Sequence, residues 1–252
     1  MTALHHRVTG DEDAPTVLMG GSLGTELQMF NAQLPLADRL RLVCFDHRGH
    51  GGSPTPPGPY EIADLGRDVL ELMDELELER ASYCGLSIGG MVGIWLGVHA
   101  PERIQRLVLI CTAAHMPPPA AWQERAAAVL EAGSAEPIAD SVVDRWLTPS
   151  FATQHPEVRA RLRLMLAESP ARGYAWCCGA IERMDQREDL ARIAAPTLVI
   201  SGSDDLAAPP DMQRLIADAI PRASYEIVGP AAHVASVEQP DQINRLIGEF
   251  LS

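Results

Sequence analysis

Long apolar runs are missing from this sequence of 252 residues. No run is long enough to cross a bilayer, and residues Met1 to Arg7 contain no apolar core of the kind that a secretory leader needs. The pattern predicts neither a membrane span nor export. We therefore expect a cytoplasmic protein.

Cysteine is scarce, and its spacing does not fit a metal site. There are five cysteines, and no two of them have the C-x-x-C spacing of common zinc sites. Three lie in apolar, strand-like runs, and the other two, Cys177 and Cys178, are adjacent and therefore poorly placed for a disulfide. We expect buried, reduced thiols and no bound metal, which fits a reducing compartment.

Positive charge is also in short supply. The chain carries 20 basic and 34 acidic residues, for a net charge of −14. Nucleic acid and anionic membrane surfaces would be repelled, so neither is expected as a partner. An anionic small molecule could bind only where the fold supplies a local cation.

Strand and helix patterns alternate through most of the chain, and 46% of its residues are hydrophobic. Apolar strand-like runs occupy residues 4–8, 16–19, 41–46, 80–84, 106–111, 196–201 and 225–228. Helical spacing of apolar residues occurs at 62–76, 91–98, 212–220 and 243–250. This alternation predicts an α/β fold with a mostly parallel central sheet and helices on both faces.

The alternation stops in the middle of the chain. From residue 115 to about residue 192 only helical patterns occur, at residues 122–130, 138–146, 158–166 and 174–181. We expect a helical cap of residues 115–192, inserted into a core of residues 1–114 and 193–252. It should lie over the carboxyl ends of the strands, where ligands bind in open α/β sheets.

The most informative motif is Gly85-Leu86-Ser87-Ile88-Gly89, between a strand-like run and an apolar helix. G-x-S-x-G in that context is a nucleophile elbow, whose sharp turn strains the serine and exposes its hydroxyl. We therefore expect Ser87 to be a nucleophile. The backbone N–H of Ile88, at the helix N-terminus, should face a developing oxyanion.

A serine nucleophile needs a base, and the base needs an acid that orients it. In chains with such an elbow, the acid follows the serine in the sequence, and the histidine follows the acid. We expect His233 to be the base, because it alone among the eight histidines lies in a short loop after the last strand. His50 is the second candidate, although its glycine-rich turn favours a structural role. For the acid we favour Asp205, at the apex of the loop after strand 196–201, with Asp204 as the alternative.

A second oxyanion donor should come from the loop after strand 16–19. That loop reads Gly20-Gly21-Ser22-Leu23-Gly24, and we expect the donor to be the N–H of Leu23.

The turn from Asp46 to Gly51 contains His47 and His50 but does not have metal-site spacing, because its residues are contiguous. We expect Asp46 and Arg48 to pair and brace the turn.

Together these motifs resemble those of α/β-hydrolases, and further stretches narrow the resemblance to 3-oxoadipate enol-lactonases of the β-ketoadipate pathway. These stretches are Ser22 to Thr25, Pro57 to Tyr60, Arg145 to Pro149, Gly173 to Cys178 and Glu238 to Pro240. The resemblance covers nearly the whole chain. The chain departs from the family at Gly20-Gly21, Ala208 and Ala235-Ser236, where the family has Ser-Asn, Thr and Ser-Asn.

The resemblance implies a serine hydrolase that opens 3-oxoadipate enol-lactone through an acyl-enzyme, without metal or organic cofactor. The partner is then a small lactone or ester that carries a carboxylate. Arg145 is the candidate cation for it, with Trp146 as a pocket wall and Ser22 as a further substrate contact. Alternatives are a general carboxylesterase, a cofactor-free perhydrolase or haloperoxidase, and a non-catalytic binding protein. The sequence predicts no oligomeric state.

Overall fold

The structure is a computed structural model that describes residues 3–251. Its centre is a seven-stranded sheet of β1 (His6–Thr9), β2 (Thr16–Gly20), β3 (Arg41–Phe45), β4 (Ala81–Leu86), β5 (Ile104–Ile110), β6 (Thr197–Gly202) and β7 (Ala223–Val228). The strand order is β1-β3-β2-β4-β5-β6-β7, and every pair is parallel except β1 with β3. The predicted α/β class is confirmed.

The chain reverses its winding direction between β2 and β4, because β3 lies on one side of β2 and β4 on the other. The loops that leave the carboxyl ends of β2 and β4 therefore separate and open a crevice, the usual ligand site of such sheets. These loops carry the predicted oxyanion donors.

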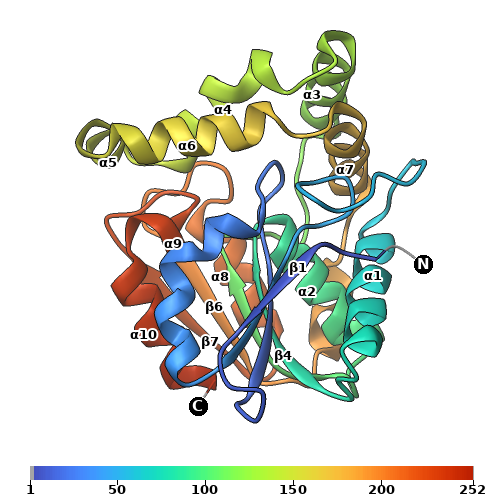
Figure 1. Cartoon of the computed structure of the whole chain (residues 1–252), viewed down its shortest axis with the longest axis vertical. Coiled ribbons are helices and arrows are strands. Elements are labelled where there is room, and N and C mark those ends of the chain that lie inside the picture. Colours follow the sequence, from blue (N-terminus) through green and yellow to red (C-terminus); the bar gives the residue numbers. More distant parts are fainter. Residues whose placement is uncertain (1–2, 252) are drawn as a thin grey trace.

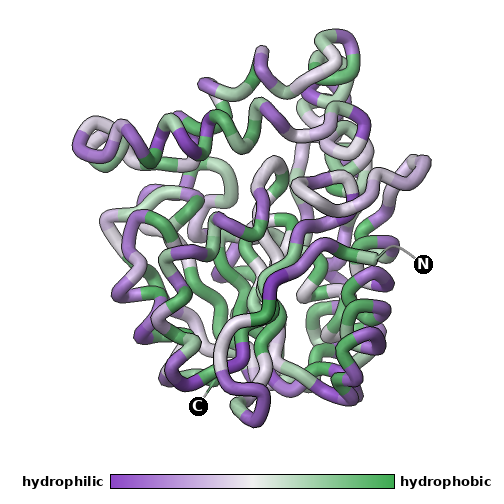
Figure 2. The backbone as a smooth tube through the Cα atoms, viewed as in Figure 1, coloured by the Kyte–Doolittle hydropathy of each residue, from purple (hydrophilic) through white to green (hydrophobic). Residues whose placement is uncertain are grey.

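Helices cover both faces of the sheet (Figure 1). One face carries α1 (Ile62–Glu75), α2 (Ile88–His99), the 3₁₀ helix η3 (Arg187–Arg192) and α8 (Pro210–Ala219). The other carries the 3₁₀ helix η1 (Leu27–Asp38), α9 (Ala235–Glu238) and α10 (Pro240–Leu251). Helix α2 has ten of its twelve residues buried, so it is apolar all round, whereas the outer helices turn a hydrophilic face to solvent (Figure 2).

Between β5 and β6 the chain forms helices and no strand of the sheet. Apart from η3, which packs against α2 and α8 on the sheet, they are α3 (Pro119–Ala132), η2 (Glu136–Ile138), α4 (Ala139–Trp146), α5 (Pro149–Gln154), α6 (Pro156–Ala167) and α7 (Ala171–Arg183). Figure 1 shows these elements, which we call the helical insertion, above the carboxyl ends of the strands. Each predicted helix of this segment is present, and α5 and η2 are additional.

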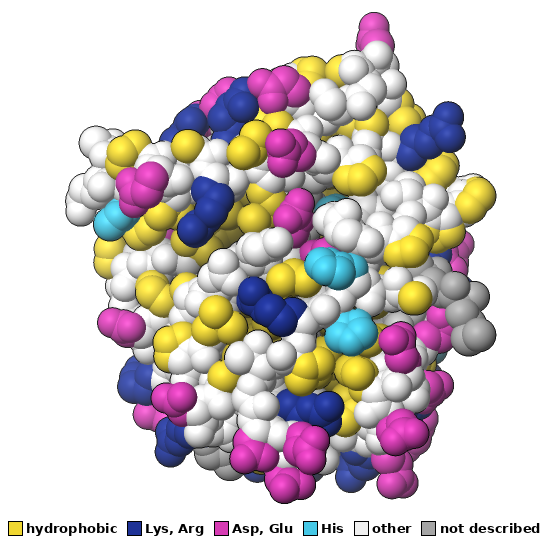
Figure 3. Space-filling view, viewed as in Figure 1, with side chains coloured by type: hydrophobic (Ala, Val, Ile, Leu, Met, Phe, Trp, Pro, Cys, Tyr) yellow, Lys and Arg dark blue, Asp and Glu magenta, His cyan; other side chains and the backbone are white. Residues whose placement is uncertain are grey.

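Ion pairs hold α4 against α6 on the outside of the helical insertion. Arg159 pairs with Asp140 and Asp144, at 2.9 and 2.7 Å, and Arg163 pairs with Asp140 at 3.0 Å and with Glu136. Acidic and basic side chains intermingle over this part of the surface (Figure 3). Within residues 3–251, no helix is long and apolar enough to cross a membrane.

Candidate active site

Ser87 lies at the turn between β4 and α2, with a strained backbone (φ 58°, ψ −118°). The turn is tight because the flanking glycines touch backbone. A Cβ on Gly85 would collide with the backbone of Gly89, and one on Gly89 would collide with the carbonyl of Gly20. The backbone N–H of Ser87 donates to the carbonyl of Ile110, the last residue of β5, at 3.0 Å, which anchors the serine to the sheet.

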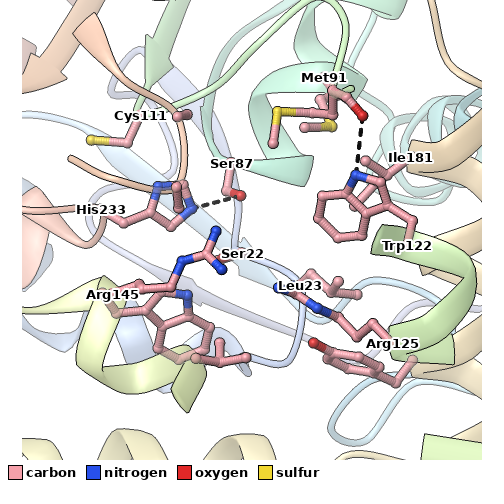
Figure 4. A pocket seen from close by; sticks show the side chains of 16 residues that line it. Ser22, Leu23, Ser87, Met91, Cys111, Trp122, Arg125, Arg145, Ile181 and His233 are labelled. Carbon is pink, nitrogen blue, oxygen red and sulfur yellow. Dashed lines mark hydrogen bonds between the residues drawn. The ribbon is translucent and has the colours of Figure 1, made fainter. Parts of the chain in front are cut away.

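A continuous hydrogen-bond chain leads from Ser87 to Asp205. His233 Nε2 lies 2.9 Å from Ser87 Oγ, and its Nδ1 lies 2.9 Å from Asp205 Oδ2 (Figure 4). The other carboxylate oxygen accepts from the N–H groups of Ala207 and Ala208 at 2.8 and 2.9 Å. All three side chains are buried. A serine hydroxyl, an imidazole and a carboxylate in this order can activate the serine.

The two alternatives from the sequence lie elsewhere. Asp204 is exposed, and its carboxylate accepts from the hydroxyl of Ser203 at 2.6 Å. His50 is buried, which lowers its pKa, and its Nε2 accepts from the N–H of Gly24 at 2.9 Å. The structure thus brings Asp205 and His233 to Ser87, and His50 instead supports the loop after β2.

The two predicted oxyanion donors are backbone N–H groups at the start of α2 and in the loop after β2. Among residues 3–251, the N–H groups of Ile88 and Leu23 have no acceptor. The loop and the helix are tied together, because the N–H of Gly89 donates to the carbonyl of Gly21 at 3.1 Å. Such free donors beside a nucleophile can stabilise an oxyanion.

The expected pair of Asp46 with Arg48 is wrong. Asp46 turns inward and accepts from the N–H groups of Leu27 and Gly52, at 2.6 and 2.9 Å, and its Oδ2 lies 2.6 Å from His5 Nδ1. Arg48 instead forms a two-pronged ion pair with Asp68 of α1, at 2.5 and 2.6 Å. Backbone donors at the start of η1 and just after the turn satisfy the aspartate, while the longer arginine reaches a carboxylate on a neighbouring helix.

His47 lies beneath the same loop. It is buried, packs edge-on against Phe45 with ring centroids 5.1 Å apart, and within residues 3–251 its Nε2 has no hydrogen-bond partner. Burial lowers the pKa of His47 to about 3. The side chain is therefore neutral at ordinary pH.

A pocket opens above Ser87 and His233, between the sheet and the helical insertion. The three predicted substrate contacts, Ser22, Arg145 and Trp146, all line it. So does Ala208, where the chain departs from the family it resembles. Further lining residues were not predicted from the sequence: Met91, Cys111, Met116, Trp122, Arg125, Val142, Tyr174, Ile181 and Ala207. For Trp122 and Arg125 the available signal was an aromatic residue and a cation three positions apart on one predicted helix.

Glu238 connects the loop of His233 to the helical insertion. One of its oxygens accepts from the N–H and the hydroxyl of Thr148, at 2.9 and 2.6 Å, and the other accepts from the N–H of Ala232 at 2.5 Å. In addition, the N–H of Val234 donates to the carbonyl of Trp146 at 3.1 Å. The loop of His233 and the pocket wall are therefore held in one hydrogen-bonded unit.

No group of three or more His, Cys, Asp or Glu side chains in residues 3–251 is arranged to hold a metal ion. The five cysteines are buried and unpaired, as expected from their sequence context.

Comparison with known proteins places the chain in a family. A family model described as the alpha/beta hydrolase fold matches residues 15–240. The 3-oxoadipate enol-lactonase 2 of Acinetobacter baylyi is 39% identical over 246 residues, which cover 97% of this chain and 91% of that protein.

Solved structures are similar along their whole length. The enol-lactonase from Burkholderia xenovorans has a TM-score of 0.96 at 39% identity, covering 99% of this chain and 96% of its own. A hydrolase from Pseudomonas aeruginosa has a TM-score of 0.96 at 42% identity, covering 100% and 95%. The resemblance to 3-oxoadipate enol-lactonases is thus confirmed, and the chain belongs to the α/β-hydrolase fold family of enzymes.

Proposed function

We propose that this protein hydrolyses 3-oxoadipate enol-lactone to 3-oxoadipate, a step in aromatic catabolism. The hydrogen-bond chain from Asp205 through His233 to Ser87, at the floor of a pocket, carries the proposal. Supporting it, two similar proteins that match nearly the whole chain are named as enol-lactonases.

In the first step, His233 Nε2 takes the proton of the Ser87 hydroxyl, and the serine oxygen attacks the lactone carbonyl carbon. The N–H groups of Leu23 and Ile88 hold the resulting oxyanion, and one such donor lowers the barrier by about 3 kcal/mol. The ring C–O bond then breaks. The leaving enolate takes the proton back from His233 and tautomerises to a ketone, while the acyl group stays on Ser87.

In the second step, His233 takes a proton from water, and the hydroxide attacks the acyl-enzyme carbonyl. Ser87 leaves with that proton, and a new carboxylate is released. Asp205 keeps the imidazole in the tautomer that presents Nε2 to the serine and stabilises the imidazolium. Every proton transfer uses a group in the chain or water, so the mechanism needs no metal or organic cofactor.

Substrate binding falls to the helical insertion, which acts as the predicted cap. Trp146 is buried in the pocket wall, Arg145 supplies positive charge, and Ser22 lies beside the oxyanion donors. A local cation is needed because the chain has a net charge of −14 and the lactone is an anion.

The first experiment compares the wild type with Ser87→Ala on enzymatically generated enol-lactone, followed by the loss of its ultraviolet absorbance. We expect rapid turnover by the wild type and a loss of about 10⁴-fold or more in the variant, since Ser87 carries the hydroxyl that His233 Nε2 contacts. The melting temperature of each protein serves as the folding control.

Negligible wild-type turnover, with Ser87 still hydrolysing a small aryl ester, would contradict the proposed substrate and favour a general carboxylesterase. Failure of Ser87 to react with both the ester and a fluorophosphonate would indicate a non-catalytic binding protein.

A further inference from the structure

Two arginines enter the pocket without an acidic partner. Arg125 of α3 and Arg145 of α4 both line it, and neither forms an ion pair with any residue in 3–251. In the part of the chain that the structure describes, no Asp or Glu lines the pocket. In a chain with 34 acidic residues, this pocket is therefore a local region of positive charge.

The two guanidinium groups occupy different ends of the pocket. Figure 4 shows Arg145 on the side of Ser87 and His233, and Arg125 on the opposite side with Trp122. The position of Arg125 is determined by packing. Its guanidinium lies over the Trp122 ring at 4.8 Å from the centroid, and the indole N–H donates to the carbonyl of Met116 at 3.1 Å.

Tyr174 adds a hydroxyl donor to the pocket lining. Its side chain is fully buried beside Arg125, and within residues 3–251 its O–H has no acceptor. Burial raises the pKa of the Tyr174 phenol, and the nearby charge of Arg125 opposes part of that rise, so the phenol stays protonated. A buried hydroxyl without an acceptor lowers the stability of the fold, unless a bound ligand supplies the acceptor.

We propose that Arg125 and Tyr174 bind the carboxylate that the substrate already carries, and that Arg145 faces the carboxylate that hydrolysis creates. The inference rests on the proposed function. In a carboxymethyl enol-lactone, the carboxylate and the reacting carbonyl lie at opposite ends of the ring. With the carbonyl at Ser87, the substrate carboxylate points away from Arg145, toward the far end of the pocket.

This assignment defines a substrate class: lactones or esters with an anionic group at the end remote from the carbonyl. It assigns the substrate carboxylate to Arg125 and Tyr174, whereas the sequence suggests Arg145. A guanidinium and a phenol hydroxyl together supply several donors, which suits the two oxygens of a carboxylate.

The test measures kcat and KM on two enol-lactones: the anionic 3-oxoadipate enol-lactone and the neutral α-angelica lactone, which has a methyl group in place of the carboxymethyl. The variants are Arg125→Gln, the near-isosteric Tyr174→Phe, Arg145→Gln and, as matched control, Arg172→Gln. Arg172 is exposed on the helix of Tyr174 and does not line the pocket.

We expect Arg125→Gln to raise KM for the anionic lactone about 10- to 100-fold, and Tyr174→Phe about 5-fold. Both variants should retain kcat and the wild-type kcat/KM for the neutral lactone, and Arg172→Gln should match the wild type. Arg145→Gln should weaken inhibition by the product, 3-oxoadipate, more than it raises KM. An equal loss on both lactones, or the KM increase in Arg145→Gln alone, would overturn the inference.

A second readout separates this inference from the proposed function. If the wild type does not open the anionic lactone, the proposed function fails, and inhibition of aryl-ester hydrolysis by adipate still tests the carboxylate site. Inhibition about 10-fold weaker in Arg125→Gln than in the wild type would then support it. Equal inhibition constants in the two proteins would overturn it.

Discussion

Two neighbouring aspartates in the loop after β6 have opposite environments. The carboxylate of Asp205 is buried and bonds to His233 and to two backbone N–H groups, whereas Asp204 is exposed and accepts from the hydroxyl of Ser203. Adjacent residues in a tight loop point in different directions, so only one of them can reach the imidazole. At the scale of single residues, the site thus depends on which side of the loop faces inward.

Substitution of these two aspartates tests that difference. Asp205→Asn should lower kcat on the lactone or an aryl ester by about 10⁴-fold, because an amide no longer holds the productive tautomer of His233. Asp204→Asn should stay within about twofold of the wild type, since its carboxylate does not touch the site. Steady-state kinetics of both variants decide, and similar losses in the two would contradict the assignment.

At the scale of elements, the site is held together by hydrogen bonds and ion pairs between segments that are distant in the chain. We call these contacts joints. Glu238 at the end of α9 joins the His233 loop to Thr148, and Trp146 accepts from the same loop. The pair of Arg48 with Asp68 likewise ties the turn after β3 to α1. These joints set the distance between the pocket floor at Ser87 and the helical insertion.

Removal of the Glu238 joint should cost both stability and substrate binding. Glu238→Ala leaves buried N–H groups of Thr148 and Ala232 without acceptors, so we expect the free energy of unfolding to fall by about 3 kcal/mol. KM should rise as Trp146 and Arg145 lose their support. Thr148→Val removes one of the three hydrogen bonds and also the N-cap acceptor of the Phe151 N–H in α5, so it should cost about 2 kcal/mol.

Urea unfolding and steady-state kinetics measure the two effects. A Glu238→Ala protein with wild-type stability and KM would show that the joint has no energetic role.

At the scale of the whole molecule, stability should depend on pH through histidines buried in neutral form. The pKa of His47 is lowered by burial to about 3, against a usual 6.5, and that of buried His50 is lowered too. As pH falls below 6.5, the unfolded chain binds protons that the folded chain does not. The free energy of unfolding therefore falls progressively as the pH is lowered from 6.5 to about 3.

We expect His47 to account for a loss of about 2 kcal/mol in the free energy of unfolding between pH 8 and pH 5. Urea unfolding of His47→Leu at both values should show a correspondingly smaller loss than the wild type. The change with pH is compared within each protein, so a general effect of the substitution cancels. His99→Gln, at an exposed histidine, should retain the wild-type loss, and a wild-type loss in His47→Leu would contradict the assignment.

The fold was largely predictable because its signals are local. Apolar runs and helical spacing depend on nearby residues, and all seven strands were predicted within a few residues of their observed bounds. Helix η1 was not predicted, because it is a 3₁₀ helix that contains Pro35 and lacks the spacing of an amphipathic α-helix. Short α5 between Pro149 and Gln154 was missed for lack of length.

The candidate site likewise has residues that the sequence predicts and residues that it does not. Ser87, His233 and the loop of Asp205 could be predicted by order along the chain, since each follows a strand and parallel strands end at one edge of the sheet. The contacts of Glu238 and the roles proposed for Arg125 and Tyr174 could not. They depend on how helices and loops that are far apart in the sequence pack together, which local patterns do not specify.

By itself, then, the sequence determined the α/β architecture, the elbow with its serine, and the family, because each is encoded in contiguous residues or in strand order. Only the tertiary structure decided which aspartate meets His233, that Arg48 pairs with Asp68 and not with Asp46, and that two unpaired arginines face one pocket. Those outcomes depend on the directions of side chains in folded loops and on packing between distant segments, which no local pattern specifies.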